Sequence, residues 1–299
     1  MATLYTQQSK NVTKTWLLMT VFFVVVIGLG WTASYVYNMP EILFIAVVFS
    51  IAMNIIGYWY SDKIVLKISG AKPATREENF DLYTIVENLS ITAGLPKPRV
   101  YIINDPVPNA FATGRNKEHA VVAVTTGLLS ILDRSELEGV IAHELSHIGN
   151  KDILLGTIAV VLVGFITLLS DFMFRSTMFG RRQRGDSNVH PILLVASIAL
   201  MILAPIVATL LQLAISRKRE FLADASGALM TRYPEGLANA LRKINEYSGL
   251  MKRANHATAH LYISNPFGSR KKLSTWSKMF STHPPAEERI NALLGNKQA

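Results

Sequence analysis

The sequence predicts a mainly α-helical membrane protein that carries a small β-sheet. Three observations lead to this fold class. Half of the 299 residues are hydrophobic and only 17% are charged, and the apolar residues gather in long uncharged runs. Two short β-branched stretches, at 99–103 and 120–124, interrupt the helical pattern. An H-E-x-x-H motif follows at 143–147, within a segment of helical periodicity.

The composition excludes several classes of protein. The chain has no cysteine, so disulfides and thiolate zinc sites are impossible. Its formal net charge is +9, which in a membrane protein is typical of loops on the cytoplasmic side. No basic stretch with interleaved aromatic residues indicates nucleic-acid binding, and we expect no nucleic-acid partner.

Two apolar runs near the N-terminus predict a transmembrane hairpin. Residues 16–37 and 42–60 contain no charged side chain, and each run is long enough to cross a bilayer. Lysines precede the first run, and lysines and an arginine follow the second, whereas the connection at 38–41 has no positive charge. This bias places the region after Tyr60 and the N-terminus on the cytoplasmic side. The first run is too long for a signal peptide, and we expect it to remain as an anchor.

The next segment, 61–98, is predicted to lie outside the membrane as part of a soluble domain. A helix is expected from about 76 to 93, ended by Gly94 and Pro96. Between the two predicted strands, the segment 107–114 is either a third strand or a loop. A small sheet that precedes the motif helix would support it.

Residues 135–149 are predicted to form the helix that the motif requires. Ser135 with Glu138 fits a capping box, and Gly149 fits a helix end. At about 100° per residue, five apolar residues share one arc, namely Leu137, Val140, Ile141, Leu145 and Ile148.

Three residues of the motif bear chemistry. His143 and His147 lie on one helical face, about 6 Å apart along the axis, so both imidazoles can bind one metal ion. Glu144 falls inside the apolar arc, where a carboxylate is destabilising unless something there uses it, such as a metal-bound water. The alternative is a chance match on an ordinary amphipathic helix. Without cysteine, a zinc site must use histidine and carboxylate ligands, which favours a catalytic site.

Two further apolar runs, at 153–170 and 192–215, follow the motif. Each is long enough to span a membrane, although Pro205 should kink the second. Four arginines lie in the connection, which the positive-inside rule disfavours on the outer side. The runs are therefore either a true hairpin or helices held against the soluble domain. In both cases the chain returns to the side from which it left.

The C-terminal part, 216–299, is expected to be soluble and helical. Glu220 and Asp224 are four apart and share a helical face. They are either an ordinary acidic pair or parts of the metal site, in which Glu220 completes a two-His, one-carboxylate set with an open fourth position. Asp224 would then accept a hydrogen bond from a ligand histidine. His283 precedes the last predicted helix, either as a solvent-exposed cap or as a functional group.

Together these residues resemble the HtpX-type membrane zinc endopeptidases, gluzincins related to the CAAX prenyl protease. The likeness covers essentially the whole chain and rests on the motif, on Glu220-Phe-x-Ala-Asp224, on 108–114 and on 281–285. It implies a zincin-type metalloprotease domain with transmembrane hairpins. The implied parts are an N-terminal hairpin (1–60), the first part of the zincin domain (61–152), a second hydrophobic hairpin (153–215) and the second part of the domain (216–299).

The resemblance also implies the roles of the site residues. One Zn²⁺ per chain would be held by His143, His147 and Glu220, with Asp224 behind them. Glu144 would take a proton from the zinc-bound water and pass it to the leaving amine.

A substrate would bind at the segment that contains Asn109 and Phe111, as an added strand. The alternative is that this segment is an ordinary hairpin strand. His283 would stabilise the transition state.

The biological role implied is proteolytic quality control in the bacterial cytoplasmic membrane. The catalytic domain would face the cytosol, and the partners would be the lipid bilayer and unfolded or damaged membrane proteins. The sequence predicts no oligomeric state.

Two other classes of function fit part of the pattern. A membrane protein that binds zinc only for structure would use the same ligands, but it would leave Glu144 without a role. A small transporter or channel of four spans would need polar groups along its path, and these spans hold hardly any.

Overall fold

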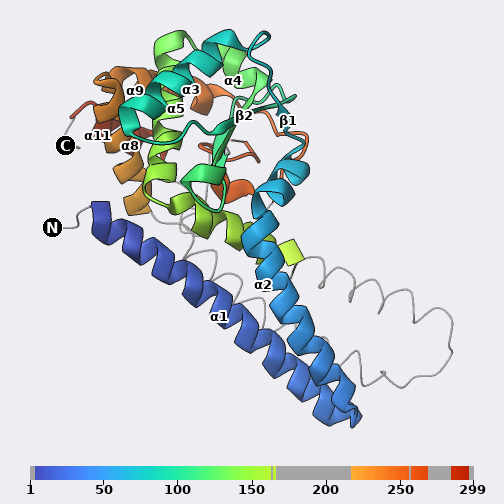
Figure 1. The fold of residues 1–299 in the computed structure, drawn as a ribbon. Coiled ribbons are helices and arrows are strands. Elements are labelled where there is room, and N and C mark those ends of the chain that lie inside the picture. Colours follow the sequence, from blue (N-terminus) through green and yellow to red (C-terminus); the bar gives the residue numbers. More distant parts are fainter. Residues whose placement is uncertain (1–3, 163, 166–216, 256, 269–283, 296–299) are drawn as a thin grey trace.

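The computed structural model describes residues 4–162, 164–165, 217–255, 257–268 and 284–295. Two long helices form a stalk, and the other helices gather with a small sheet into a head at one end of it (Figure 1). The four-stranded sheet and the predominance of helix confirm the predicted fold class.

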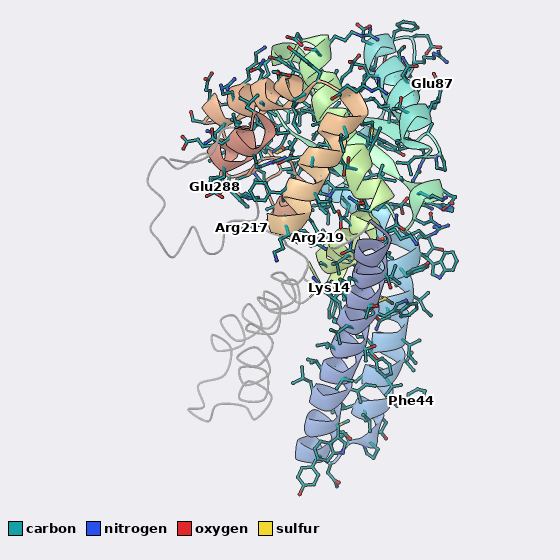
Figure 2. All side chains as sticks on the ribbon, turned by 90° about the vertical axis from the view of Figure 1, so that its left-hand side faces the viewer. Lys14, Phe44, Glu87, Arg217, Arg219 and Glu288 are labelled. Atoms are coloured by element: carbon teal, nitrogen blue, oxygen red, sulfur yellow. The ribbon has the colours of Figure 1, made fainter. Side chains whose placement is uncertain are left out.

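The stalk consists of α1 (Leu4–Tyr37) and α2 (Pro40–Ser69). By length and composition, Gln8–Trp31 and the whole of α2 can cross a membrane. Both helices extend beyond the predicted apolar runs into polar sequence, and α2 is capped at its C-terminal end by Gly70, whose φ of 69° is left-handed. Figure 2 places Phe44 on the stalk, far from the head. Large apolar side chains are exposed along α2, as lipid contact requires; they include Phe44, Ile45, Val48, Ile51 and Ile55.

The start of the third apolar run packs against the stalk. The helix Asp152–Leu162 leaves α5 (Arg134–Gly149), the helix that carries the motif, at an angle of 83°. A buried apolar cluster joins it to α1 and contains Leu18, Phe22, Leu155, Ile158 and Leu162. Most of the rest of this run, the arginine-rich connection and all of 192–215 lie outside the described residues. The second hairpin therefore stays a prediction.

The sheet has the strand order β1-β2-β4-β3. Its strands are β1 (Lys72–Pro73), β2 (Arg99–Ile103), β3 (Ala110–Thr113) and β4 (Val121–Thr125). β2 runs parallel to β4, and β1 and β3 pair antiparallel at the two edges. The predicted strand at 99–103 coincides with β2, the one at 120–124 is shifted by one residue, and the ambiguous segment 107–114 contains the edge strand β3.

Helix α5 begins with a different cap from the predicted one. Asp133 Oδ1 accepts the N–H of Glu136 at 2.9 Å, and Glu136 Oε2 accepts the N–H of Asp133 at 2.9 Å. The predicted pair of Ser135 and Glu138 is wrong, because Ser135 already lies inside the helix and its hydroxyl donates to Asp133 Oδ1. Both pairs have the spacing of a capping box, and the extended backbone of Asp133 selects the first. The helix ends at Gly149, as predicted.

Helix α5 is the centre of the head. The helices around it are α3 (Phe80–Ala93), α8 (Arg217–Thr231) and α9 (Pro234–Glu246), while α11 (Ala286–Leu293) packs on α8 and α9. The edge strand β3 also packs against α5. Shorter elements complete the head, namely α4 (Thr126–Ile131), η1 (Lys117–His119) and η2 (Ala259–Leu261). Helix α8 approaches α5 closely at Gly227, where a Cβ would lie 3.0 Å from the backbone nitrogen of His143. This close crossing brings the start of α8 to the motif.

Candidate metal centre

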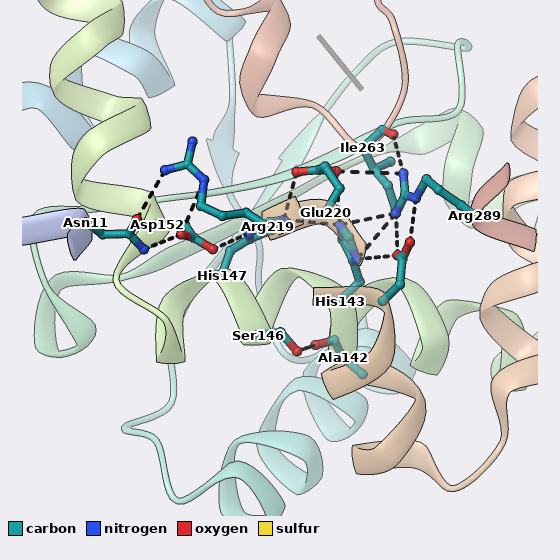
Figure 3. Close-up of polar contacts among 11 residues, drawn as sticks. Asn11, Ala142, His143, Ser146, His147, Asp152, Arg219, Glu220, Ile263 and Arg289 are labelled. Carbon is teal, nitrogen blue, oxygen red and sulfur yellow. Dashed lines mark hydrogen bonds and ion pairs between the residues drawn. The ribbon is translucent and has the colours of Figure 1, made fainter. Parts of the chain in front are cut away.

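Three side chains from two helices form a triangle of possible metal ligands. Nε2 of His143 and Nε2 of His147, one helical turn apart on α5, lie 3.2 Å from each other. Glu220 of α8 completes the triangle: its Oε2 lies 3.9 Å from His143 Nε2 and its Oε1 3.6 Å from His147 Nε2. A tetrahedral zinc ion with bonds of about 2.0–2.1 Å separates its ligand atoms by about 3.3–3.4 Å. The donor set and the spacing therefore fit one zinc ion, and Figure 3 shows the three side chains converging.

The other ring nitrogen of His143 faces a carboxylate. Asp224 lies one turn after Glu220 on α8, and its Oδ1 is 2.9 Å from His143 Nδ1. A proton on Nδ1 that is donated to Asp224 leaves the lone pair of Nε2 for a cation.

Asp224 in turn is bound by an arginine that the sequence reasoning missed. Arg289 of α11 is buried and donates two hydrogen bonds to Asp224, from Nε to Oδ2 at 2.8 Å and from Nη2 to Oδ1 at 2.6 Å. Its Nη1 donates to the carbonyl of Ile263 at 3.3 Å and lies 3.9 Å from Oε2 of Glu220. A buried guanidinium needs anionic partners of this kind. A signal for it existed: Arg289 precedes Leu293 by four residues and so lies on the apolar face of its helix.

His147 has its own carboxylate, which the sequence reasoning also missed. Oδ2 of Asp152 lies 2.9 Å from Nδ1 of His147. Asp152 begins the helix Asp152–Leu162, just beyond the bend that follows α5. An aspartate immediately before an apolar run, five residues after the motif, was the available signal. Each histidine of the triangle thus has its Nδ1 against an aspartate and its Nε2 at the triangle.

Glu144 lies buried on the same helix beside the triangle. Burial raises the pKa of its carboxyl to about 7, and the charge of Glu220 adds to the rise. The charges of His147 and Arg289 and the backbone N–H of Ala112 in β3 oppose it. A carboxyl group whose pKa is near neutrality can both accept and return a proton at pH 7.

The two histidines differ in basicity. Burial, and next the positive charge of Arg289, lower the pKa of His143 to about 4, although Asp224 opposes the shift. Burial alone would lower the pKa of His147 too, but the hydrogen bond to Asp152 and the charge of Glu220 raise it to about 9. Metal binding requires both rings to offer a neutral Nε2, which His143 offers more readily.

The remaining predicted residues lie elsewhere. The side chain of Asn109 joins β3 to Ser264, donating to its carbonyl at 2.9 Å and accepting its N–H at 3.2 Å. Phe111 is buried edge-to-face against Tyr262, with ring centroids 5.1 Å apart, in a different apolar cluster from the one that contains Leu145 of α5. The structure thus does not bring the Phe111 side chain to the triangle. His283 lies outside the described residues.

Comparisons of the sequence with known proteins indicate a family of peptidases. Residues 76–297 match the family model described as Peptidase family M48. A curated "Protease HtpX homolog" from Caldanaerobacter subterraneus subsp. tengcongensis is 47% identical over 97% of both chains. Another from Pyrococcus furiosus is 49% identical over 94% of both chains. Among solved structures, the crystal structure of S. mikatae Ste24p matches with a TM-score of 0.49 and 18% identity; the match covers 95% of this chain and 64% of the other.

Proposed function

The chain belongs to peptidase family M48 and is a membrane metalloprotease, and we propose that it hydrolyses peptide bonds at a zinc ion with Glu144 as the general base. One observation carries this proposal. The candidate ligand atoms of two histidines and a glutamate lie 3.2 to 3.9 Å from one another, and the buried carboxyl of Glu144 lies on the same helix as the two histidines.

The ligands in this proposal are His143, His147 and Glu220, and they hold one zinc ion per chain. Asp224 orients His143. When bound, zinc supplies a Lewis acid that activates water and polarises the scissile carbonyl. Glu144 accepts the proton of the attacking water and passes it to the leaving amine.

The edge strand β3 is the proposed binding surface for an extended substrate, which would add to the sheet as a further strand. Its position at the sheet edge and the Ala112 N–H beside Glu144 support this role. The carbonyl of Ala110 already accepts the N–H of Ile263 at 2.9 Å, so a substrate would pair from Ala112 onward. In this proposal Asn109 and Phe111 act by fixing the strand. His283 remains the proposed transition-state contact on the resemblance alone.

The proposed setting is the bacterial cytoplasmic membrane, as a multi-pass protein with its head in the cytosol. The stalk and the lysine bias around it support this orientation. The proposed substrates are unfolded or damaged membrane proteins, so that the enzyme serves quality control. The proposed division of the chain is a hairpin (1–60), a split zincin domain (61–152 and 216–299) and a second hairpin (153–215).

The test is cleavage of an unfolded membrane protein by the detergent-solubilised full chain, with bound zinc measured in parallel. We expect cleavage that a chelator abolishes and added zinc restores. Glu144→Gln should keep about one zinc per chain and lose cleavage, because it removes only the proton acceptor.

Appreciable cleavage by Glu144→Gln would remove Glu144 from the mechanism. Zinc binding without chelator-sensitive cleavage by the wild type would favour a structural zinc site instead.

A further inference from the structure

Side chains of α1 bind the backbone of the bend that follows α5, where the head meets the stalk. Helix α5 ends at Gly149, and the chain turns through Asn150 and Lys151 before the next helix begins. Gln8 Nε2 donates to the carbonyl of Gly149 at 2.7 Å, and Asn11 Nδ2 donates to the carbonyl of Asn150 at 3.0 Å. Carbonyls at the end of a helix lack partners within the helix. Here the first turns of the stalk helix provide them.

Asn11 also binds the aspartate behind His147. Its Nδ2 lies 2.6 Å from Oδ1 of Asp152, whose other oxygen faces His147 Nδ1 at 2.9 Å. The side chain of Asn11 is buried. A single carboxylate therefore links the stalk to a proposed zinc ligand, and Figure 3 shows this chain of contacts from Asn11 to His147.

A buried arginine completes the cluster. Arg219 Nη1 donates to Oδ1 of Asn11 at 3.3 Å, and Arg219 Nε lies 3.7 Å from Oδ1 of Asp152. The amide of Asn11 is thus used at both ends, with its NH₂ on carbonyl and carboxylate oxygens and its oxygen on the guanidinium. Figure 2 shows Arg219 where the head meets the stalk. Arg219 immediately precedes Glu220 in the chain, and Asp152 contacts His147. The cluster therefore adjoins two of the three proposed ligands.

We infer that Asn11 is a positioning residue for the metal centre, an inference that rests on the proposed function. By binding Oδ1, Asn11 fixes the carboxylate of Asp152 so that Oδ2 receives the Nδ1–H of His147 and Nε2 points at the metal. Asn11 also keeps Arg219 from competing with His147 for the carboxylate of Asp152. Arg219 Nε already lies at ion-pair distance from Oδ1 of Asp152, at 3.7 Å; without the amide the guanidinium would approach this carboxylate more closely and turn Oδ2 away from His147. The stalk helix is then part of the metal centre as well as a membrane anchor.

The inference is tested on the full chain in detergent, by zinc affinity measured in competition with a chelator. Asn11→Leu has nearly the same size and removes the contacts of the amide. We expect zinc affinity to fall by about 10–100-fold, the range for losing a group that orients a ligand histidine. Gln8→Leu is the matched control, because it removes a contact to the same bend without touching Asp152, and it should leave zinc affinity unchanged.

A double-mutant cycle separates positioning from packing. If Asn11 acts through Asp152, Asn11→Leu added to Asp152→Asn should weaken zinc binding no further than Asp152→Asn alone. Additive losses, or wild-type affinity in Asn11→Leu, would overturn the inference. Should Asn11→Leu fail to fold, Asn11→Asp decides: it keeps an acceptor for Arg219 but sets a carboxylate against Asp152, so it too must lose zinc affinity.

A separate measurement, zinc binding by the wild type and by His147→Ala, tests the proposed metal ligands themselves. Wild-type zinc binding that His147→Ala abolishes would support the proposed ligands, whatever Asn11→Leu does. Zinc binding that survives His147→Ala would instead count against the proposed function, and with it the inference that rests on it.

Discussion

The two histidines of the metal centre are supported by different parts of the molecule. Behind His143 stands Asp224, held by two hydrogen bonds from the buried Arg289, and all three belong to the head. Behind His147 stands Asp152, held by the amide of Asn11 from the stalk. The chemistry at the ring is the same on both sides, an Nδ1 against a carboxylate oxygen at 2.9 Å.

The difference lies in what fixes each carboxylate. On the His143 side a buried cation and a buried anion compensate each other, and removing either one leaves a charge without a partner. On the His147 side a neutral amide binds the aspartate at 2.6 Å and the buried Arg219 lies farther away, at 3.7 Å, so less electrostatic energy depends on the ion pair. The first arrangement belongs to the folding of the head, while the second depends on where the stalk helix lies. Variants that separate the two sides should therefore differ in stability and zinc affinity.

The largest effect is expected where the two sides meet. Glu220 closes the triangle with both histidines, so Glu220→Gln removes an anionic ligand from the centre. It should lose most of the bound zinc and all cleavage, measured by metal analysis and a substrate assay. Glu144→Gln is the comparison, because it should keep the zinc. Full zinc occupancy in Glu220→Gln would mean that the third ligand is another residue.

The next effect concerns the buried cation on the His143 side. Arg289→Met leaves Asp224 buried without its charged partner, and we expect the free energy of unfolding to fall by about 3–5 kcal/mol. Denaturant titration in detergent measures it. The matched control is Arg219→Met, the buried arginine of the His147 side, whose contacts to Asn11 and Asp152 are longer, at 3.3 and 3.7 Å. Equal losses in the two variants would remove the asymmetry between the two sides.

A smaller effect should follow from neutralising either carboxylate. Asp224→Asn and Asp152→Asn each remove the charge behind one histidine, and each should weaken zinc affinity by about 10–100-fold in a chelator competition. The two variants should differ in the melting temperature of the zinc-free protein. Asp224→Asn also deprives Arg289 of its carboxylate, so it should melt at the lower temperature. The reverse order would show that the head does not depend on this ion pair.

The parts of the site that could be predicted are those set by local spacing. Four-residue separations placed His143 with His147 and Glu220 with Asp224 on common helical faces, and the structure brings the two pairs together. The apolar runs and β-branched stretches likewise predicted the stalk and most of the sheet. In each case the evidence lies within one element, where periodicity reports directly on geometry.

Two of the missed residues, Arg289 and Asn11, have partners that are distant in the chain. Arg289 binds an aspartate 65 residues away, and Asn11 binds one 141 residues away. Periodicity shows which face a residue occupies but not which element covers that face. A polar residue at the end of an apolar run therefore looks like an ordinary solvated one. The prediction of the α5 cap was wrong for another reason, because two candidate pairs overlap and only the backbone of Asp133 distinguishes them.

The smallest effect is expected at the N-terminal end of α5, which serves as the baseline for both sides. Asp133→Ala removes the cap that the structure shows, so the melting temperature should fall by about 2–4 °C, the shift typical of a lost helix cap in a protein of this size. Ser135→Ala, at the residue that the sequence favoured, should change it less, because among the described residues its hydroxyl bonds only to Asp133. Neither variant touches the aspartates behind the histidines, so zinc affinity should stay at the wild-type value. If Asp133→Ala weakened zinc binding as much as Asp152→Asn does, any loosening of α5 would disturb the metal centre. The zinc losses expected at Asp152 and Asn11 would then report helix stability rather than the orientation of His147.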